Sequence, residues 1–304
     1  MFNQYRNIST YRLNRELPFD TEEIETQFDA FRFTRCGAND MSRSGFVNPL
    51  TNDSEGVLAY SASGFLVARI QTESKLLPSG VINAAVKERV EKLQTEQARK
   101  LKKTEKDSIK DEVLHTLIPR AFTASAFTTV LFDLKGNRIF INAGARKAEN
   151  ALAIVRKALS SLPVVPLTFE SPIELTLTEW VSATSAPAGF AIGDRAELKA
   201  LLEDGGHARL NKQDLTGDEV QSLLAAGKLV TRLALDWQER IQFVLNDGGQ
   251  LTGVKFSDSL VEQNDDIDRD DELQRKSADV LLMGSELVAL FDNLIVALGG
   301  EAKR

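Results

Sequence analysis

The sequence predicts an α+β protein with largely antiparallel sheets. Short segments in which apolar and polar residues alternate occur in pairs around turn residues, which is typical of β-hairpins. Amphipathic helical segments are mixed with these pairs along the chain, and this order favours antiparallel pairing. The 304 residues are 42% hydrophobic and 27% charged, which is ordinary for a globular protein of one large domain or two.

The N-terminal part, residues 1–80, is predicted to be a small α+β unit. Its helix begins at Asp20 or Thr21, because either side chain can cap the first turn and acidic residues follow it. The elements expected here are a strand at 5–13, a helix at 19–31, an extended segment at 31–36 and two strands within 57–74 joined at 61–64.

The middle part, residues 81–182, opens with a long charged helix over 81–118. Its apolar stripe thins between Gln94 and Ser108 and returns at Ile109, so the sequence leaves open whether the helix is continuous there. Pro119 ends it. The elements expected afterwards are two strands within 128–144 turning at 135–137, a helix at 145–162 and strands at 163–169 and 173–180.

The C-terminal part, residues 183–304, follows a linker rich in Ser, Ala, Pro and Gly at 182–190. We expect a second α+β unit here, with Thr216 as the N-cap of one helix, and with Ser285 before the last helix and Gly299 closing it. The elements are helices at 194–206 and 215–227, a β-meander over 229–257 turning at 246–249, and a helix at 285–300.

The residues that could support catalysis or targeting are few. Cys36 is the only cysteine, which excludes an internal disulfide and a cysteine-based zinc site. His115 and His207 are the only histidines, and surface positions are the simpler interpretation of both. No nucleotide-binding, hydrolase or metalloprotease motif, signal peptide or bilayer-spanning run is found. We therefore expect a cytoplasmic protein that is not an enzyme, needs no cofactor or metal and does not bind membranes.

The charge is distributed unevenly. The whole chain carries −7, but 13 basic and six acidic residues between Arg99 and Lys157 give this span +7 and leave −14 for the rest. Such a separation suits a protein that binds a polyanion on one surface and repels it elsewhere. An ordinary solvated helix face with pairs such as Glu96 with Lys100 explains the same pattern.

The opposite charge gathers near the C-terminus. Asp265, Asp266, Asp268, Asp270 and Asp271 suggest a metal site, but an EF-hand beginning at Asp266 needs glycine at 271 and glutamate at 277 and finds neither. A solvated acidic loop is the favoured interpretation. A magnesium-dependent nuclease site and a protein-binding surface over 265–272 remain as alternatives.

Long blocks of the sequence resemble the recombination-associated RdgC proteins of proteobacteria. The resemblance covers essentially the whole chain, more loosely in the first hundred residues. The blocks are EQARKLKKTEKDSIKDEVLHTLIPRAF, SSLPVVPL, SPIELTLTEW, LEDGG, KQDLT, LALDWQERIQFVL, DIDRDDE and LGGEA.

This resemblance implies a homodimeric ring that binds double-stranded DNA with little sequence preference and restrains RecA-dependent recombination at the nucleoid. A two-subunit ring requires two separate self-complementary contacts. The alternative is a regulator that contacts the recombinase directly.

The resemblance also implies roles for individual residues. Phe122 is expected at a dimer contact that opens for DNA, although the pattern alone favours an ordinary core phenylalanine. The residues expected to contact DNA phosphates are Arg99, Lys100, Lys102, Lys103, Lys106, Arg120 and Lys212.

Overall fold

The computed structural model describes residues 5–15, 20–202, 205–268 and 271–302. Its centre is a 12-stranded sheet in the order β2-β4-β5-β6-β1-β12-β11-β10-β8-β9, with β3 added on β4 and β7 on β1. Every ladder between named strands is antiparallel. The prediction of an α+β fold with largely antiparallel sheets is confirmed.

The strands fall into an N-terminal and a C-terminal half, which meet where β1 pairs with β12. The first half contains β1 (Asn7–Leu13), β2 (Ser42–Val47), β3 (Ala59–Ala62), β4 (Phe65–Lys75), β5 (Thr123–Asp133), β6 (Arg138–Ile141) and β7 (Val164–Pro166). The second contains β8 (Phe190–Ala200), β9 (His207–Asn211), β10 (Lys228–Trp237), β11 (Ile241–Asn246) and β12 (Leu251–Phe256).

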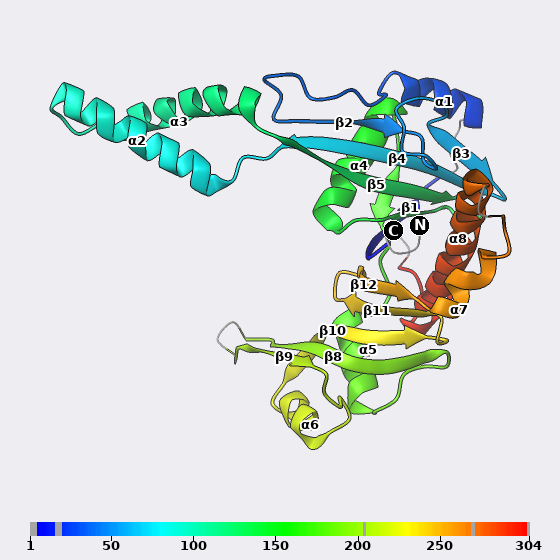
Figure 1. Cartoon of the computed structure of the whole chain (residues 1–304). Coiled ribbons are helices and arrows are strands. Elements are labelled where there is room, and N and C mark those ends of the chain that lie inside the picture. Colours follow the sequence, from blue (N-terminus) through cyan, green and yellow to red (C-terminus); the bar gives the residue numbers. More distant parts are fainter. Residues whose placement is uncertain (1–4, 16–19, 203–204, 269–270, 303–304) are drawn as a thin grey trace.

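The helices pack on the sheet or extend from it. They are α1 (Thr21–Asp29), α2 (Ser79–Gln97), α3 (Lys103–Leu117), α4 (Ala145–Ala158), α5 (Ile173–Ser182), α6 (Asp218–Ala225), α7 (Asp258–Val261) and α8 (Glu272–Ala297), with 3-10 turns at Ile118–Arg120 and Glu262–Asn264. Together these elements form an open C, in which α2 and α3 project outward from the ends of β4 and β5 and α8 lies along the closed side (Figure 1).

Two hydrophobic cores hold the C together. One lies under α1 and α4, where Phe28 of α1 stacks on Phe46 of β2 with ring centroids 3.9 Å apart. The other lies under α5 and α8 and includes Phe65 of β4 as well as Phe243 of β11. Because this second core joins strands of both halves, the structure packs residues from all three predicted parts together. The division at 80 and 182 stays a prediction.

The long helix expected over 81–118 is two helices. The chain leaves α2 at Ala98, which adopts a left-handed φ of 51°, and begins α3 at Lys103, so the two helices run back along each other as a hairpin. Only Ile109 of α3, and no residue of α2, is buried. The thinning of the apolar stripe after Gln94 therefore marks the turn of this hairpin.

Two other predictions are wrong: one predicted strand is a helix, and one predicted helix is largely a strand. Residues 173–180 form helix α5 rather than a strand, because Ile173, Leu177 and Trp180 recur at helical spacing and are buried, whereas Leu175 is 51% exposed. A helix is expected over 194–206, but residues 194–200 lie in β8, and residues 203 and 204 of this range lie outside the described residues. Pairing with β9 and β10 overrides the helix propensity of this segment.

Smaller differences concern element ends and two strands. No strand is predicted at β2 or β9, and no regular strand forms at 31–36, where the backbone makes a single bridge from Arg32 to Phe46. The helix cap at Asp20 is confirmed, with Glu23 completing a capping box. Gly217, not Thr216, caps α6, and α8 begins at Glu272, 13 residues before Ser285.

Helix α8 is long and apolar enough to cross a membrane by length and composition. Glu286 and Asp292 interrupt its apolar residues, so the sequence still has no uninterrupted apolar run of about 20 residues. The apolar character has a local explanation, since Leu287, Leu290, Phe291 and Leu294 are fully buried against the sheet. One or two such helices are weak evidence for a membrane span, because buried core helices pass the same test.

Candidate nucleic-acid interface

The basic run occupies the far end of the arm, which we define as the α2–α3 hairpin, residues 79–117. Arg99 and Lys100 lie in the turn and Lys102 caps α3, while Lys103 and Lys106 lie in its first turn. All five side chains are exposed, and the turn is anchored by the buried Leu101. The structure therefore presents the run away from the body of the protein (Figure 1).

One carboxylate shapes this turn. Glu105 accepts two hydrogen bonds from the Arg99 guanidinium, at 2.6 and 3.0 Å, and a third from the backbone N–H of Lys102 at 2.7 Å. The hydrogen bonds from Arg99, followed by that from Lys102, lower the pKa of Glu105 from 4.5 to about 2. Arg99 is thus partly neutralised by its own turn, and the lysines carry most of the remaining positive charge.

Arg120 and Phe122 lie at the opposite end of the arm, in the neck where α3 joins β5. Helix α3, about 22 Å long from 15 residues at about 1.5 Å each, has the lysines of the run at or just before its first turn and Arg120 and Phe122 beyond its last turn. Phe122 is 85% exposed, so the interpretation as an ordinary core phenylalanine is wrong. Its backbone oxygen accepts a hydrogen bond from Leu76, which is also exposed, at 2.7 Å.

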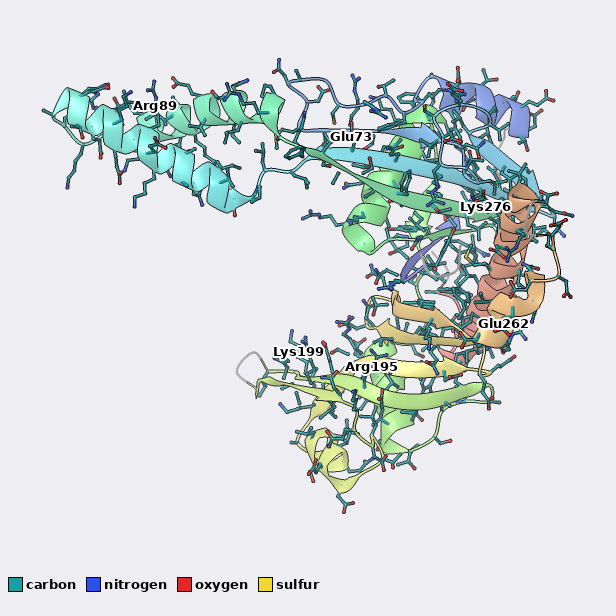
Figure 2. All side chains as sticks on the ribbon, viewed as in Figure 1. Glu73, Arg89, Arg195, Lys199, Glu262 and Lys276 are labelled. Carbon is teal, nitrogen blue, oxygen red and sulfur yellow. The ribbon has the colours of Figure 1, made fainter. Side chains whose placement is uncertain are left out.

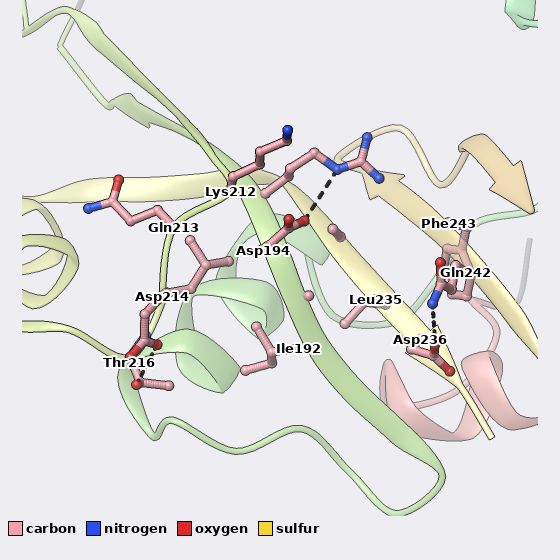
Figure 3. Close-up of a pocket in the computed structure, with 14 residues that line it drawn as sticks. Ile192, Asp194, Lys212, Gln213, Asp214, Thr216, Leu235, Asp236, Gln242 and Phe243 are labelled. Atoms are coloured by element: carbon pink, nitrogen blue, oxygen red, sulfur yellow. Dashed lines mark hydrogen bonds and ion pairs between the residues drawn. The ribbon is translucent and has the colours of Figure 1, made fainter. Parts of the chain in front are cut away.

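Lys212 lies in the other limb of the C, just after β9. Its φ of 53° is in the left-handed region, where residues other than glycine are uncommon. Its side chain lines a pocket of about 840 Å³ together with Asp194, Arg195 and Gln213 (Figure 3). Within one subunit, the structure does not bring Lys212, Arg120 and the basic run together into one patch.

The rest of the positive span is divided between the core and the surface. Arg138 is buried and bonded to Asp133 and to Asp292 of α8, the latter at 2.6 Å. Arg146 and Lys147, in contrast, are exposed on the first turn of α4. The basic residues that give this span its net charge of +7 therefore do not form a single surface.

The acidic stretch is largely engaged in starting α8. Asp271 caps the helix by accepting from the Gln274 N–H at 2.9 Å, Asp265 pairs with Arg275 at 3.0 Å and Glu272 pairs with Lys276 at 2.6 Å. Asp270 lies outside the described residues. Among the residues that are described, no group of three or more His, Cys, Asp or Glu side chains could hold a metal ion.

The histidines are not brought together either. His115 is exposed in the last turn of α3 and His207 is exposed at the start of β9, on different limbs of the C. Cys36 donates its backbone N–H to Glu73, and burial, followed by its hydrogen bond to Glu73, raises the pKa of its thiol. These groups form no arrangement of nucleophile, base and orienting acid.

The geometry defines a class of protein: an antiparallel α+β molecule whose charged groups are displayed along surfaces and limbs rather than gathered in one enclosed pocket. Residues 2–301 match the family model described as "Putative exonuclease, RdgC". The chain belongs to the RdgC family.

Relatives from two bacteria show the degree of similarity. The chain is 54% identical over 300 residues to the recombination-associated protein RdgC of Yersinia pestis (strain Pestoides F), covering 98% of this chain and 99% of that one. It is also 54% identical over 301 residues to the protein of the same name from Serratia proteamaculans (strain 568), covering 99% of each. The predicted resemblance to this family is confirmed, and with it an association with recombination.

Proposed function

We propose that this protein binds double-stranded DNA without sequence preference, encircles it as a dimeric ring and thereby restrains RecA-dependent recombination in the cytoplasm, at the nucleoid. The observation that carries the proposal is the display of four exposed lysines, at 100, 102, 103 and 106, at the end of an arm that projects from the body. Lysines and arginines contact phosphates irrespective of base sequence.

Exposed apolar side chains on both limbs support the dimeric part of the proposal. Phe122 is 85% exposed at the neck of the arm, and Leu201 and Leu202 are 78% and 79% exposed after β8. A closed ring of two C-shaped subunits needs two self-complementary contacts, and apolar groups at separate places can supply them.

Fluorescence anisotropy with two unrelated duplexes across a salt series tests the DNA-binding part. We expect equal affinities and a steep log–log slope, and the variant Lys102→Gln/Lys103→Gln should lower the slope by up to about 1.8 because each lost phosphate contact removes about 0.9. The control Lys135→Gln/Lys276→Gln removes the same charge elsewhere and should leave the slope unchanged. Absence of binding at low salt would refute the proposal.

Sedimentation tests the dimer contact. Phe122→Ser should lower the dimer fraction while each subunit stays folded. Leu175→Ser removes another exposed apolar side chain, 51% exposed on α5, and should not lower it. An unchanged dimer fraction in Phe122→Ser would remove Phe122 from the contact.

The mode of RecA restraint is tested by competition. If the protein acts by occupying DNA, excess duplex should restore strand exchange, whereas a regulator that contacts the recombinase directly would act in proportion to recombinase concentration. We favour occupation of DNA, because the acidic residues Asp265, Asp271 and Glu272 already bond within the chain.

The family description includes the word exonuclease, so nuclease activity is tested separately. We propose that the protein is not an enzyme and needs no cofactor. End-labelled duplex incubated with magnesium or manganese should remain intact, and stepwise shortening that Asp265→Asn/Asp266→Asn abolishes would show the opposite.

A further inference from the structure

Within the described part of the chain, no helix packs on one face of the C-terminal sheet. Along β11 the burial alternates strictly, with Ile241, Phe243 and Leu245 buried and Gln242 exposed. Helix α5 packs on the buried face, where Thr178 accepts a hydrogen bond from the Val230 N–H at 2.8 Å. We call the opposite face, across β9, β8, β10, β11 and β12, the open face.

Basic side chains from four of these five strands lie on the open face or its rim. Glu197 of β8 is opposite Arg209 of β9 and Arg232 of β10, and Gln242 of β11 is opposite Lys255 of β12, which places each pair on one face. The basic residues are Arg195, Lys199, Arg209, Arg232 and Lys255, and the acidic ones are Glu197 and Asp236. Asp194 lies at the irregularity of β8, with Oδ1 3.6 Å from Nε of Arg195. Figure 2 shows Arg195 and Lys199 on the limb across from the arm.

The open face is also hollowed. A groove of about 320 Å³ lies between Arg195, Glu197, Arg209 and Arg232. The pocket of about 840 Å³ that contains Lys212 also includes Arg195 in its wall, so the two depressions adjoin. Four spacings between the five strands amount to about 19 Å, over which a duplex carries about eleven phosphates.

The acidic side chains on the face differ in what they bind. Asp236 accepts from the Glu239 N–H at 2.8 Å and from the Gln242 amide at 2.9 Å, so it serves the β10–β11 turn. Glu197 instead lies between two arginines, with Oε1 at 2.8 Å from Nε of Arg209 and 3.6 Å from Nη1 of Arg232. Lys199 and Lys255 make no ion pair with another described residue.

We propose that the open face of the C-terminal sheet is a second phosphate-binding surface for duplex DNA, and that Glu197 is its built-in competitor. Glu197 positions Arg209 and Arg232 in the free protein and cancels one of their charges. DNA phosphates, which accept the same forked hydrogen bonds, displace it from the arginines on binding. This inference rests on the proposed DNA binding and extends it from the arm to the opposite limb.

The competitor role makes an unusual prediction, because removing one side chain should improve binding. In duplex titrations across a salt series, Glu197→Gln should lower Kd about threefold to fourfold near physiological salt and steepen the log–log slope by about 0.9, as expected for one more released counterion. Lys199→Gln/Lys255→Gln should raise Kd and flatten the slope by up to about 1.8. Circular dichroism and thermal unfolding check that each variant is folded.

The outcomes separate this inference from the proposed function. Lys135→Gln/Lys276→Gln is the matched control, and Figure 2 shows Lys276 on α8 at the closed side of the C. If Lys102→Gln/Lys103→Gln weakens binding while Glu197→Gln and Lys199→Gln/Lys255→Gln behave like the control, the open face does not bind DNA and the arm alone does. That result overturns the inference. The partner of the open face would then be an acidic protein. If the unaltered protein binds no duplex, both proposals are wrong.

Discussion

Single residues in this protein act mainly by fixing turns. Glu105 ties Arg99 and the start of α3 into one geometry, and Gly45 allows β2 to pass the backbone of Phe33. Neither residue carries a motif that a sequence scan would detect. Both set the position of larger elements, so their substitutions have distinguishable effects.

Glu105 makes the end of the arm sensitive to acid. Since its pKa is lowered from 4.5 to about 2 by Arg99 and Lys102, its contribution to the folded turn is present above pH 4.5 and is lost as the pH falls towards 2. Amide hydrogen exchange at 98–106 should show protection factors that fall across this window in the native protein. Arg99→Ala should show lower protection already at pH 6 and a flatter pH dependence, and an unchanged profile would contradict this role of the pair.

Gly45 should tolerate no side chain. A Cβ added there would lie 2.5 to 2.8 Å from backbone atoms of Phe33 and Phe31, so Gly45→Ala should lower the free energy of unfolding by about 1–3 kcal/mol. Gly80→Ala is the matched control, because a Cβ there meets nothing within 4 Å and alanine favours helix, which predicts a gain of up to about 1 kcal/mol. Urea denaturation measures both, and equal effects would contradict the packing argument.

Among the elements, the arm is an insertion in a β-hairpin. Lys75 and Thr123 are cross-strand partners at the ends of β4 and β5, and the residues between them, 76–122, lie outside the sheet. The arm has almost no buried side chains of its own, whereas the ends of β4 and β5 that lie farthest from it, residues 65–70 and 129–133, are buried. The body therefore does not depend on the arm for its core.

Removal of the arm should leave a folded body. Replacing residues 79–120 with a short Gly-Ser linker keeps the β4–β5 register, so we expect native-like circular dichroism and a single cooperative unfolding transition. Duplex affinity should fall with the loss of the lysines at the turn. An unfolded product would show that the arm contributes to the core.

Elements with strong local signals could be predicted from the sequence, whereas elements set by tertiary contacts could not. The Asp20 cap, the turn at 246–249 and the meander around it carry their own turn and capping residues. Strand β8 consists of residues that favour helix in isolation and becomes a strand only between β9 and β10. The basic run was recognisable by composition, but the open face was not, because its residues are contributed by strands separated along the chain.

At the scale of the whole molecule, α8 holds the two limbs at one angle. It contacts the N-terminal half through Phe291, 5.3 Å from the ring of Phe140, and through Asp292, which pairs with Arg138. It contacts the C-terminal half through Glu286, whose carboxylate accepts from Arg240 at 2.7 Å. The opening of the C is therefore set by a helix on its outer side.

Phe291→Ala should consequently destabilise the entire body. Its ring is fully buried in the core shared by both halves, so the loss should be about 3–5 kcal/mol, with one unfolding transition retained. Denaturation followed by tryptophan fluorescence reports the C-terminal half through Trp180 and Trp237, and circular dichroism reports the whole chain. Two separated transitions would show that the halves fold independently.

The arm also has a mechanical consequence. It is joined to the body through the β4–β5 neck, and α2 alone is about 28 Å long, from 19 residues at about 1.5 Å each. The two chain segments of this neck are joined by the hydrogen bond from the Leu76 N–H to the Phe122 oxygen, so a rotation of the arm about the neck would centre on these two residues. A rotation of about 10° about the neck would move the lysine-bearing end by about 5 Å, which is roughly the rise of one helical turn. A small rotation at the neck would thus become a large change in the distance between the lysine-bearing end of the arm and the C-terminal half.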